Sequence, residues 1–151
     1  FWGRGNGWAM LGLVYTLELL PQDHAEYRTV LNSLERLAGT VNARQDEQTG
    51  LWHTVVDHPE TCLEGSVSLM FANAFMRAVR TGLLPASYAR AGEFAWSALY
   101  EQVDPDGLVR NVSQRTPPRQ NPADYNLPPI GGHYPWGQGS YLLTAATYLG
   151  Y

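Results

Sequence analysis

The residues with the clearest chemical potential lie at the start of the chain, where Trp2, Arg4, Asn6 and Trp8 alternate with three glycines. Arginine carries a permanent charge on a planar group that matches a carboxylate, and tryptophan offers a flat apolar face for a sugar ring. A glycine-rich turn that leads into a helix also leaves backbone N–H groups free for an anion. One interpretation of this pattern is a binding loop for an acidic sugar. The alternative is a glycine-rich helix entry with two core tryptophans.

A second group of candidate residues precedes the last apolar segment of the chain. His133 and Trp136 follow a proline-rich stretch, and Gln138 comes next with a side-chain amide that suits sugar hydroxyls. We expect His133 and Trp136 to line the same pocket as the first group. The alternative is an aromatic lid that only packs the mouth of the fold.

The chain offers no clear acid–base pair. Glu64 stands three residues after Thr61, the spacing of a capping box, so a role as a helix cap is favoured over a role as a catalytic acid. The four histidines and the single cysteine, Cys62, lack the spacing of metal ligands, so no metal and no other cofactor is expected.

Five helices are expected to position these residues. The first, third and fifth are apolar on most sides and should be buried, whereas the second and fourth carry one apolar stripe each and should cover them. Each buried helix follows a loop with a tryptophan and opens with glycine. This alternation predicts an all-α, partial toroid of helix hairpins whose inner helices begin at one mouth. The expected helices are Ala9–Leu20, Asp23–Ala38, Thr61–Gly82, Ser87–Leu99 and Tyr141–Leu149.

The connections between these helices are less regular. Residues 51–56 and 108–112 have the composition of short strands. Between them and the last helix, Thr116 to Gly132 is rich in proline and forms a long irregular loop, and loops of that length in a compact domain are often functional.

The glycine-rich segment also resembles a known signature. Trp2-Gly3-Arg4-Gly5-Asn6-Gly7-Trp8 is similar to the motif of the unsaturated rhamnogalacturonyl and glucuronyl hydrolases of glycoside hydrolase family 105, with family 88 as its cousin. Gly50-Leu51-Trp52 and Gly137-Gln138-Gly139 match as well. The resemblance spans the chain but only the C-terminal part of that family's (α/α)6 barrel. Residues 1–151 are therefore expected to form the C-terminal part of one barrel domain.

The resemblance implies a glycoside hydrolase that acts on unsaturated uronyl, rhamnogalacturonan-type oligosaccharides by hydration of the C4–C5 double bond. In the family, the aspartate that serves as general acid and base lies well before the glycine-rich signature, so no catalytic residue carries over to this chain. The resemblance does imply substrate-binding residues in this chain: Arg4 is expected to bind a carboxylate, Asn6 to make a polar contact, and Trp2 and Trp8 to contact the sugar ring. Two alternatives stay open, a non-catalytic carbohydrate-binding or scaffold toroid fragment and a sugar epimerase-like toroid enzyme.

Charge and length limit the partners. A net charge of −4 argues against a nucleic-acid surface, and no apolar run reaches the roughly 20 residues of a membrane helix. The sequence does not fix the compartment, although the resemblance favours the cytoplasm. Five helices make only a partial ring with exposed apolar sides. We therefore expect an acidic oligosaccharide as substrate, and either the remaining hairpins or another chain to close the toroid.

Overall fold

The fold is all-α, as the sequence predicts. The computed structural model describes all 151 residues and contains five α-helices and two short 3₁₀ helices. Backbone pairing between extended segments is limited to four isolated bridges, such as Trp2 with Val55, so the strands expected at 51–56 and 108–112 do not form. The helices are α1 (Gly3–Leu19), α2 (Tyr27–Asn42), α3 (Gly65–Arg80), η1 (Ala86–Tyr88), α4 (Ala89–Leu99), η2 (Pro122–Asn126) and α5 (Pro135–Tyr148).

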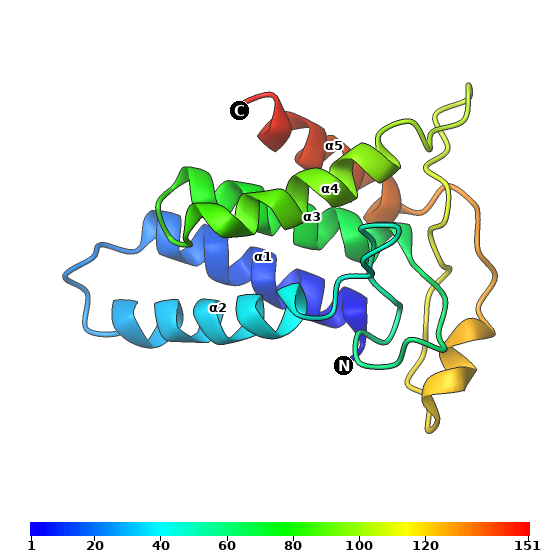
Figure 1. The fold of residues 1–151 in the computed structure, drawn as a ribbon, viewed down its shortest axis with the longest axis horizontal. Coiled ribbons are helices and arrows are strands. Elements are labelled where there is room, and N and C mark those ends of the chain that lie inside the picture. Colours follow the sequence, from blue (N-terminus) through cyan, green and yellow to red (C-terminus); the bar gives the residue numbers. More distant parts are fainter.

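The helices form two layers. In Figure 1, α1, α3 and α5 run in the same direction and begin at the same end of the molecule, while α2 and α4 return in the opposite direction. The middle helix, α3, packs against α1, α4 and α5, and α2 packs against α1. This is an arc of an α/α toroid, with three inner helices and two outer helices.

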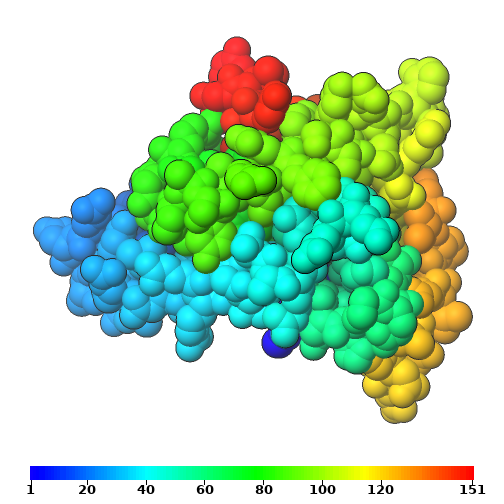
Figure 2. Space-filling model, viewed as in Figure 1, coloured from blue at the N-terminus to red at the C-terminus, as the bar shows by residue number.

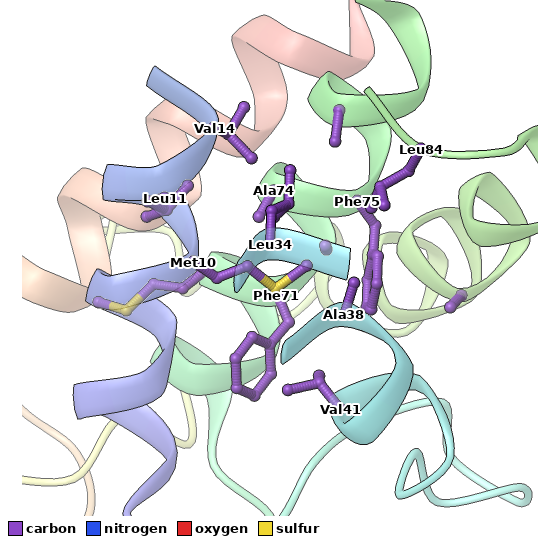
Figure 3. Close-up of a cluster of buried hydrophobic side chains, with 14 of the residues drawn as sticks. Met10, Leu11, Val14, Leu34, Ala38, Val41, Phe71, Ala74, Phe75 and Leu84 are labelled. Atoms are coloured by element: carbon purple, nitrogen blue, oxygen red, sulfur yellow. The ribbon is translucent and has the colours of Figure 1, made fainter. Parts of the chain in front are cut away.

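The main core lies where α1, α2 and α3 meet. Figure 3 shows side chains from the three helices pointing toward one another, among them Met10 of α1, Leu34 of α2 and Phe71 of α3. The Trp52 ring contacts Phe71 edge-on at 5.3 Å between centroids, and its indole N–H donates to the Val41 carbonyl at 2.8 Å. The core therefore also fixes the loop that leads into α3.

The glycine-rich segment is helix, not a loop. The helix expected at Ala9 begins at Gly3, and the helix expected at Tyr141 begins at Pro135. Glycine is needed in α1 because α3 approaches closely: a Cβ at Gly3 would lie 2.7 Å from Val67 Cγ1, and one at Gly7 would lie 2.8 Å from Met70 Sδ. The Gly3 N–H donates to the Thr54 carbonyl at 2.8 Å, so it is not free for an anion.

Two expected helix starts are also corrected. The second helix, expected to begin at Asp23, begins at Tyr27 and has no side-chain cap, because Glu26 at the N-cap position makes no such hydrogen bond. The third begins at Gly65, where Glu64 itself is the N-cap and accepts a hydrogen bond from the Val67 N–H at 2.7 Å. Thr61 instead donates to the His58 carbonyl at 2.7 Å and holds the preceding turn.

Only α3 is buried on nearly all sides. The helices α1 and α5 were expected to be buried as well, but each keeps an exposed apolar face because it lies at an end of the inner row and packs against only one other inner helix, α3. The exposed fractions are 51% for Trp8, 85% for Leu19, 68% for Leu142 and 70% for Leu149. No helix combines the length and the hydropathy needed to cross a bilayer.

Candidate functional site

A buried polar cluster lies where the inner helices begin. Arg4 comes from the first turn of α1 and Glu64 from the N-cap of α3, and the Arg4 Nη1 atom lies 3.6 Å from Glu64 Oε1. Both side chains are almost fully shielded, with exposed fractions of 4% for Arg4 and 0% for Glu64. The pair therefore links two inner helices at the mouth of the arc.

The guanidinium of Arg4 is held mainly by the chain itself. Its Nη1 donates to the Ser113 carbonyl at 3.0 Å, and its Nη2 donates to the Gln114 carbonyl and to Thr116 Oγ1, each at 3.0 Å. Nε makes no hydrogen bond within the chain. Burial lowers the pKa of Arg4, and the nearby Glu64 carboxylate partly opposes this shift.

Ser113 connects the cluster to α5. Its N–H donates to Glu64 Oε1 at 2.8 Å and its hydroxyl donates to the same atom at 3.0 Å. Its carbonyl accepts from Arg4 and also from the Trp136 indole N–H at 3.0 Å. Every polar atom of Ser113 is thus engaged, and this residue fixes the position of Trp136 relative to Arg4.

The Arg4 guanidinium lies between two tryptophan rings. Its central carbon is 4.9 Å from the centroid of Trp136 and 5.6 Å from that of Trp2, which are cation–π distances. The Trp136 ring stacks in turn on Tyr134 at 5.2 Å. The Trp2 indole N–H is buried without an acceptor, so the cluster keeps one unpaired donor.

A hollow of about 240 Å³ opens above this cluster. Six residues line it, namely Trp2, Arg4, Trp8, Arg115, Thr116 and Trp136. It is smaller than the roughly 300–1,000 Å³ pockets that hold drug-sized ligands, and its size suits a single sugar ring. None of the lining residues is a carboxylate. The hollow can bind an anion and stack on a ring, but its own side chains supply no acid.

The hollow brings together four of the six residues singled out in the sequence. Asn6 and His133 lie elsewhere. The Asn6 amide donates to the Trp2 carbonyl at 2.8 Å and faces a second hollow between α1 and α2. His133 is exposed, and its Nε2 lies 3.5 Å from Asp106 Oδ2. Asn6 and His133 therefore belong to segments near the starts of α1 and α5, but neither side chain lines the hollow.

Arg115 and Thr116 were missed because they stand at the entrance to the long loop, in a stretch with no motif of its own. The loop is anchored at two places. Its start is held by Arg4 and by the bond from the Gln114 N–H to the Pro129 carbonyl at 2.9 Å. Its η2 turn is held by Asn126, whose Oδ1 accepts from the Cys62 N–H at 2.7 Å. Figure 2 shows the loop, in yellow and orange, along one edge of the molecule.

Glu64 acts as a cap and as the counter-ion of Arg4, and its carboxylate faces Ser66, Val67 and Ser113 beneath the hollow. A catalytic role for it gains no support from this arrangement. No group of three or more His, Cys, Asp or Glu side chains is arranged to hold a metal ion.

Known proteins resemble the chain over its whole length. The profile of Glycosyl Hydrolase Family 88 matches residues 1–151. The unsaturated rhamnogalacturonyl hydrolase YesR of Bacillus subtilis is 34% identical over 149 residues, which are 99% of this chain and 41% of that protein. An unsaturated 3S-rhamnoglycuronyl hydrolase of Formosa agariphila is 30% identical over 155 residues, which are 99% of this chain and 38% of that protein.

Solved structures give the same result. A crystal structure of a possible member of family 105 from Salmonella enterica superposes on this chain with a TM-score of 0.90 at 31% sequence identity. The match covers 98% of this chain and 39% of the Salmonella chain. The chain thus spans about two fifths of the length of the relatives it matches. The fold and the profile agree with the resemblance carried by the glycine-rich segment, and we conclude that the chain belongs to glycosyl hydrolase family 88.

Proposed function

We propose that the chain forms the wall of a substrate site in a hydrolase that acts on unsaturated uronyl oligosaccharides of the rhamnogalacturonan type. One observation carries the proposal: the hollow at the start of the inner helices is lined by the guanidinium-bearing Arg4 together with the rings of Trp2 and Trp136. The names of YesR and of the Formosa agariphila protein support the same substrate class.

The residues around the hollow suit hydration of the C4–C5 double bond. The Arg4 Nε–H donates to the uronyl carboxylate next to C5, and the tryptophans stack on the ring. A proton adds to C4 and water adds to C5, and the resulting hemiketal opens and releases the second sugar. The proton donor is assigned outside residues 1–151, in agreement with the position of the family's aspartate. These residues then form the C-terminal part of a closed barrel.

The test uses the intact gene product with an unsaturated uronyl disaccharide and its methyl ester, and follows the loss of the short-wavelength ultraviolet absorbance of the conjugated double bond. We expect kcat/KM for the ester to fall at least about tenfold, because a hydrogen bond to a charged group contributes about 1.5–3 kcal/mol. Equal turnover of acid and ester would show that Arg4 does not recognise the carboxylate. Absence of turnover for both would reject the hydrolase assignment.

The absence of a carboxylate in the hollow also favours a second candidate, a non-catalytic carbohydrate-binding fragment. The two are separated by a second readout on the same protein. Ligand-dependent quenching of tryptophan fluorescence without any loss of absorbance supports the binding role, because Trp2, Trp8 and Trp136 all line the hollow.

A further inference from the structure

The long loop at the mouth has the form of an Ω-loop, whose two ends lie close together. At its base, the Gln114 N–H donates to the Pro129 carbonyl at 2.9 Å. Residues 115–128, the rim loop, leave from this base and return to it. The first residues of the rim loop, Arg115 and Thr116, line the hollow. The position of the rim loop therefore decides the shape of one wall of the hollow.

The far end of the rim loop is held by one side chain. Asn126, the last residue of η2, accepts a hydrogen bond from the Cys62 N–H through Oδ1 at 2.7 Å and donates to the Glu60 carbonyl through Nδ2 at 3.3 Å. Both partners are backbone groups of the segment before α3, which runs beside η2 in Figure 1. The other side-chain hydrogen bonds of η2 stay within the rim loop, so Asn126 alone connects η2 to the rest of the fold in this way.

A row of backbone hydrogen bonds continues from Asn126 to the start of α1. The Thr54 N–H donates to the Cys62 carbonyl, and the Gly3 N–H donates to the Thr54 carbonyl, each at 2.8 Å. Gly3 precedes Arg4, which itself holds the start of the rim loop. The rim loop is thus tied to α1 at both ends, directly by Arg4 and through the backbone of Cys62 and Thr54.

We propose that Asn126 is the latch of the rim loop and a positioning residue for the hollow. With the latch closed, the rim loop stays against the mouth and the hollow keeps a shape that receives one sugar ring. With the latch open, the rim loop moves about its paired base and the wall of the hollow is lost. A preformed wall favours binding, because less of the chain has to be ordered by the ligand. The link to a saccharide rests on the proposed function, whereas the latch itself does not.

The experiment uses trypsin to measure the opening of the latch without turnover. The protease cleaves a chain that has transiently left the fold, so the rate of cleavage after Arg119, followed by mass spectrometry on the intact gene product, reports the open fraction. Asn126→Ala removes both hydrogen bonds of the latch. Asn121→Ala is the matched control, because the Asn121 side chain contacts only Asp124 within the same loop.

We expect Asn126→Ala to raise the cleavage rate about three- to tenfold, the effect of losing two exposed hydrogen bonds, and Asn121→Ala to leave the rate within about twofold. A saturated uronyl disaccharide should slow cleavage of the parent and of Asn126→Ala, because a ligand in the hollow stabilises the closed rim loop. With the unsaturated substrate, Asn126→Ala should raise KM about three- to tenfold and leave kcat within about twofold, because the rim loop shapes the hollow but supplies no proton.

Three results would overturn the proposal. Equal cleavage of the parent and of Asn126→Ala would show that Asn126 is not a latch. A cleavage rate that stays constant while the disaccharide quenches tryptophan fluorescence would separate the rim loop from the hollow. A lower kcat with an unchanged KM would place the effect of Asn126 outside binding. Failure of the proposed function would be seen differently, as absence of turnover in the parent, and the cleavage rates would still test the latch.

Discussion

The Glu64 carboxylate shows how one buried residue organises several parts of a site. It caps α3 through Val67, holds Ser113 by its N–H and its hydroxyl, and offsets the charge of Arg4. A buried charge without a partner is far more costly than a buried pair. Glu64 is therefore a positioning residue whose removal should affect Arg4 and the following loop together.

Replacement of Glu64 by glutamine keeps the size of the side chain but removes its charge, and places an NH₂ group among donors that need an acceptor. We expect a loss of about 2–4 kcal/mol in the free energy of unfolding, because Arg4 then stays buried without a counter-ion. Urea denaturation of the intact gene product measures the change. The control is Glu60→Gln, at an exposed position, which should leave the midpoint unchanged. An unchanged midpoint for Glu64→Gln would contradict this role.

At the scale of the elements, the glycines of α1 decide how closely α1 approaches α3. Gly7 lies against Met70, whereas a Cβ added at Gly12 on the same helix would meet no atom within 4 Å. The same substitution should therefore have opposite effects at the two positions. In a helix, alanine is favoured over glycine by about 0.5–1 kcal/mol wherever space allows it.

We expect Gly7→Ala to destabilise the protein by about 1–3 kcal/mol, because the added methyl group would lie 2.8 Å from Met70 Sδ and 2.9 Å from Met70 Cβ and would force the helices apart. Gly12→Ala should stabilise it by a few tenths of a kcal/mol up to about 1 kcal/mol. Denaturant midpoints of the two variants check the difference in sign. A stabilising Gly7→Ala would show that the packing of α1 on α3 is loose.

The sequence predicted the number and order of the helices better than their starts. The apolar patterns of α2, α3 and α4 are strong enough to locate these helices. The starts of α1 and α5 were misplaced because Gly3, Gly7 and Gly137 have low helix propensity, and only contacts with Val67, Met70 and Val112 explain why glycine is required there. These contacts join residues far apart in the sequence and are not visible in a local pattern.

The candidate site was predicted in the same uneven way. Trp2, Arg4, Trp8 and Trp136 were singled out from their residue types and their places before or at the start of inner helices, and all four line one hollow. Arg115 and Thr116 were not found, because only the hydrogen bonds from Arg4 bring that segment to the hollow. Asn6 and His133 were placed on the correct segments, but the sequence could not tell toward which side their side chains point.

At the scale of the whole molecule, the apolar faces of α1 and α5 are the main unsatisfied feature. Trp8 and Leu19 are exposed on α1, and Leu142 on α5 and Leu149 just after it are exposed as well, where a closed toroid would place neighbouring helices. Apolar surface of this kind promotes association. The exposed faces are consistent with our proposal that further hairpins complete the barrel.

We expect the isolated 151-residue chain to self-associate rather than to form a stable monomer. Sedimentation velocity should detect oligomers whose fraction rises with concentration. The double variant Leu142→Glu, Leu149→Glu should shift the chain toward monomer, since it places one charge on the exposed face of α5 and one at its C-terminal end. The control is Thr29→Glu, Asn32→Glu on the exposed face of α2, which should leave the distribution unchanged. A monodisperse monomer with a cooperative thermal transition would contradict the expectation.

The fully engaged backbone and hydroxyl of Ser113 determine where this fold tolerates changes in chain length. Insertions or deletions next to residue 113 would break bonds to Glu64, Arg4 and Trp136 at once. Between residues 117 and 121 the loop is exposed and tied by few bonds, so its length is free to vary. We therefore expect the loop to tolerate insertions between residues 117 and 121, and the segment around Ser113 to tolerate none.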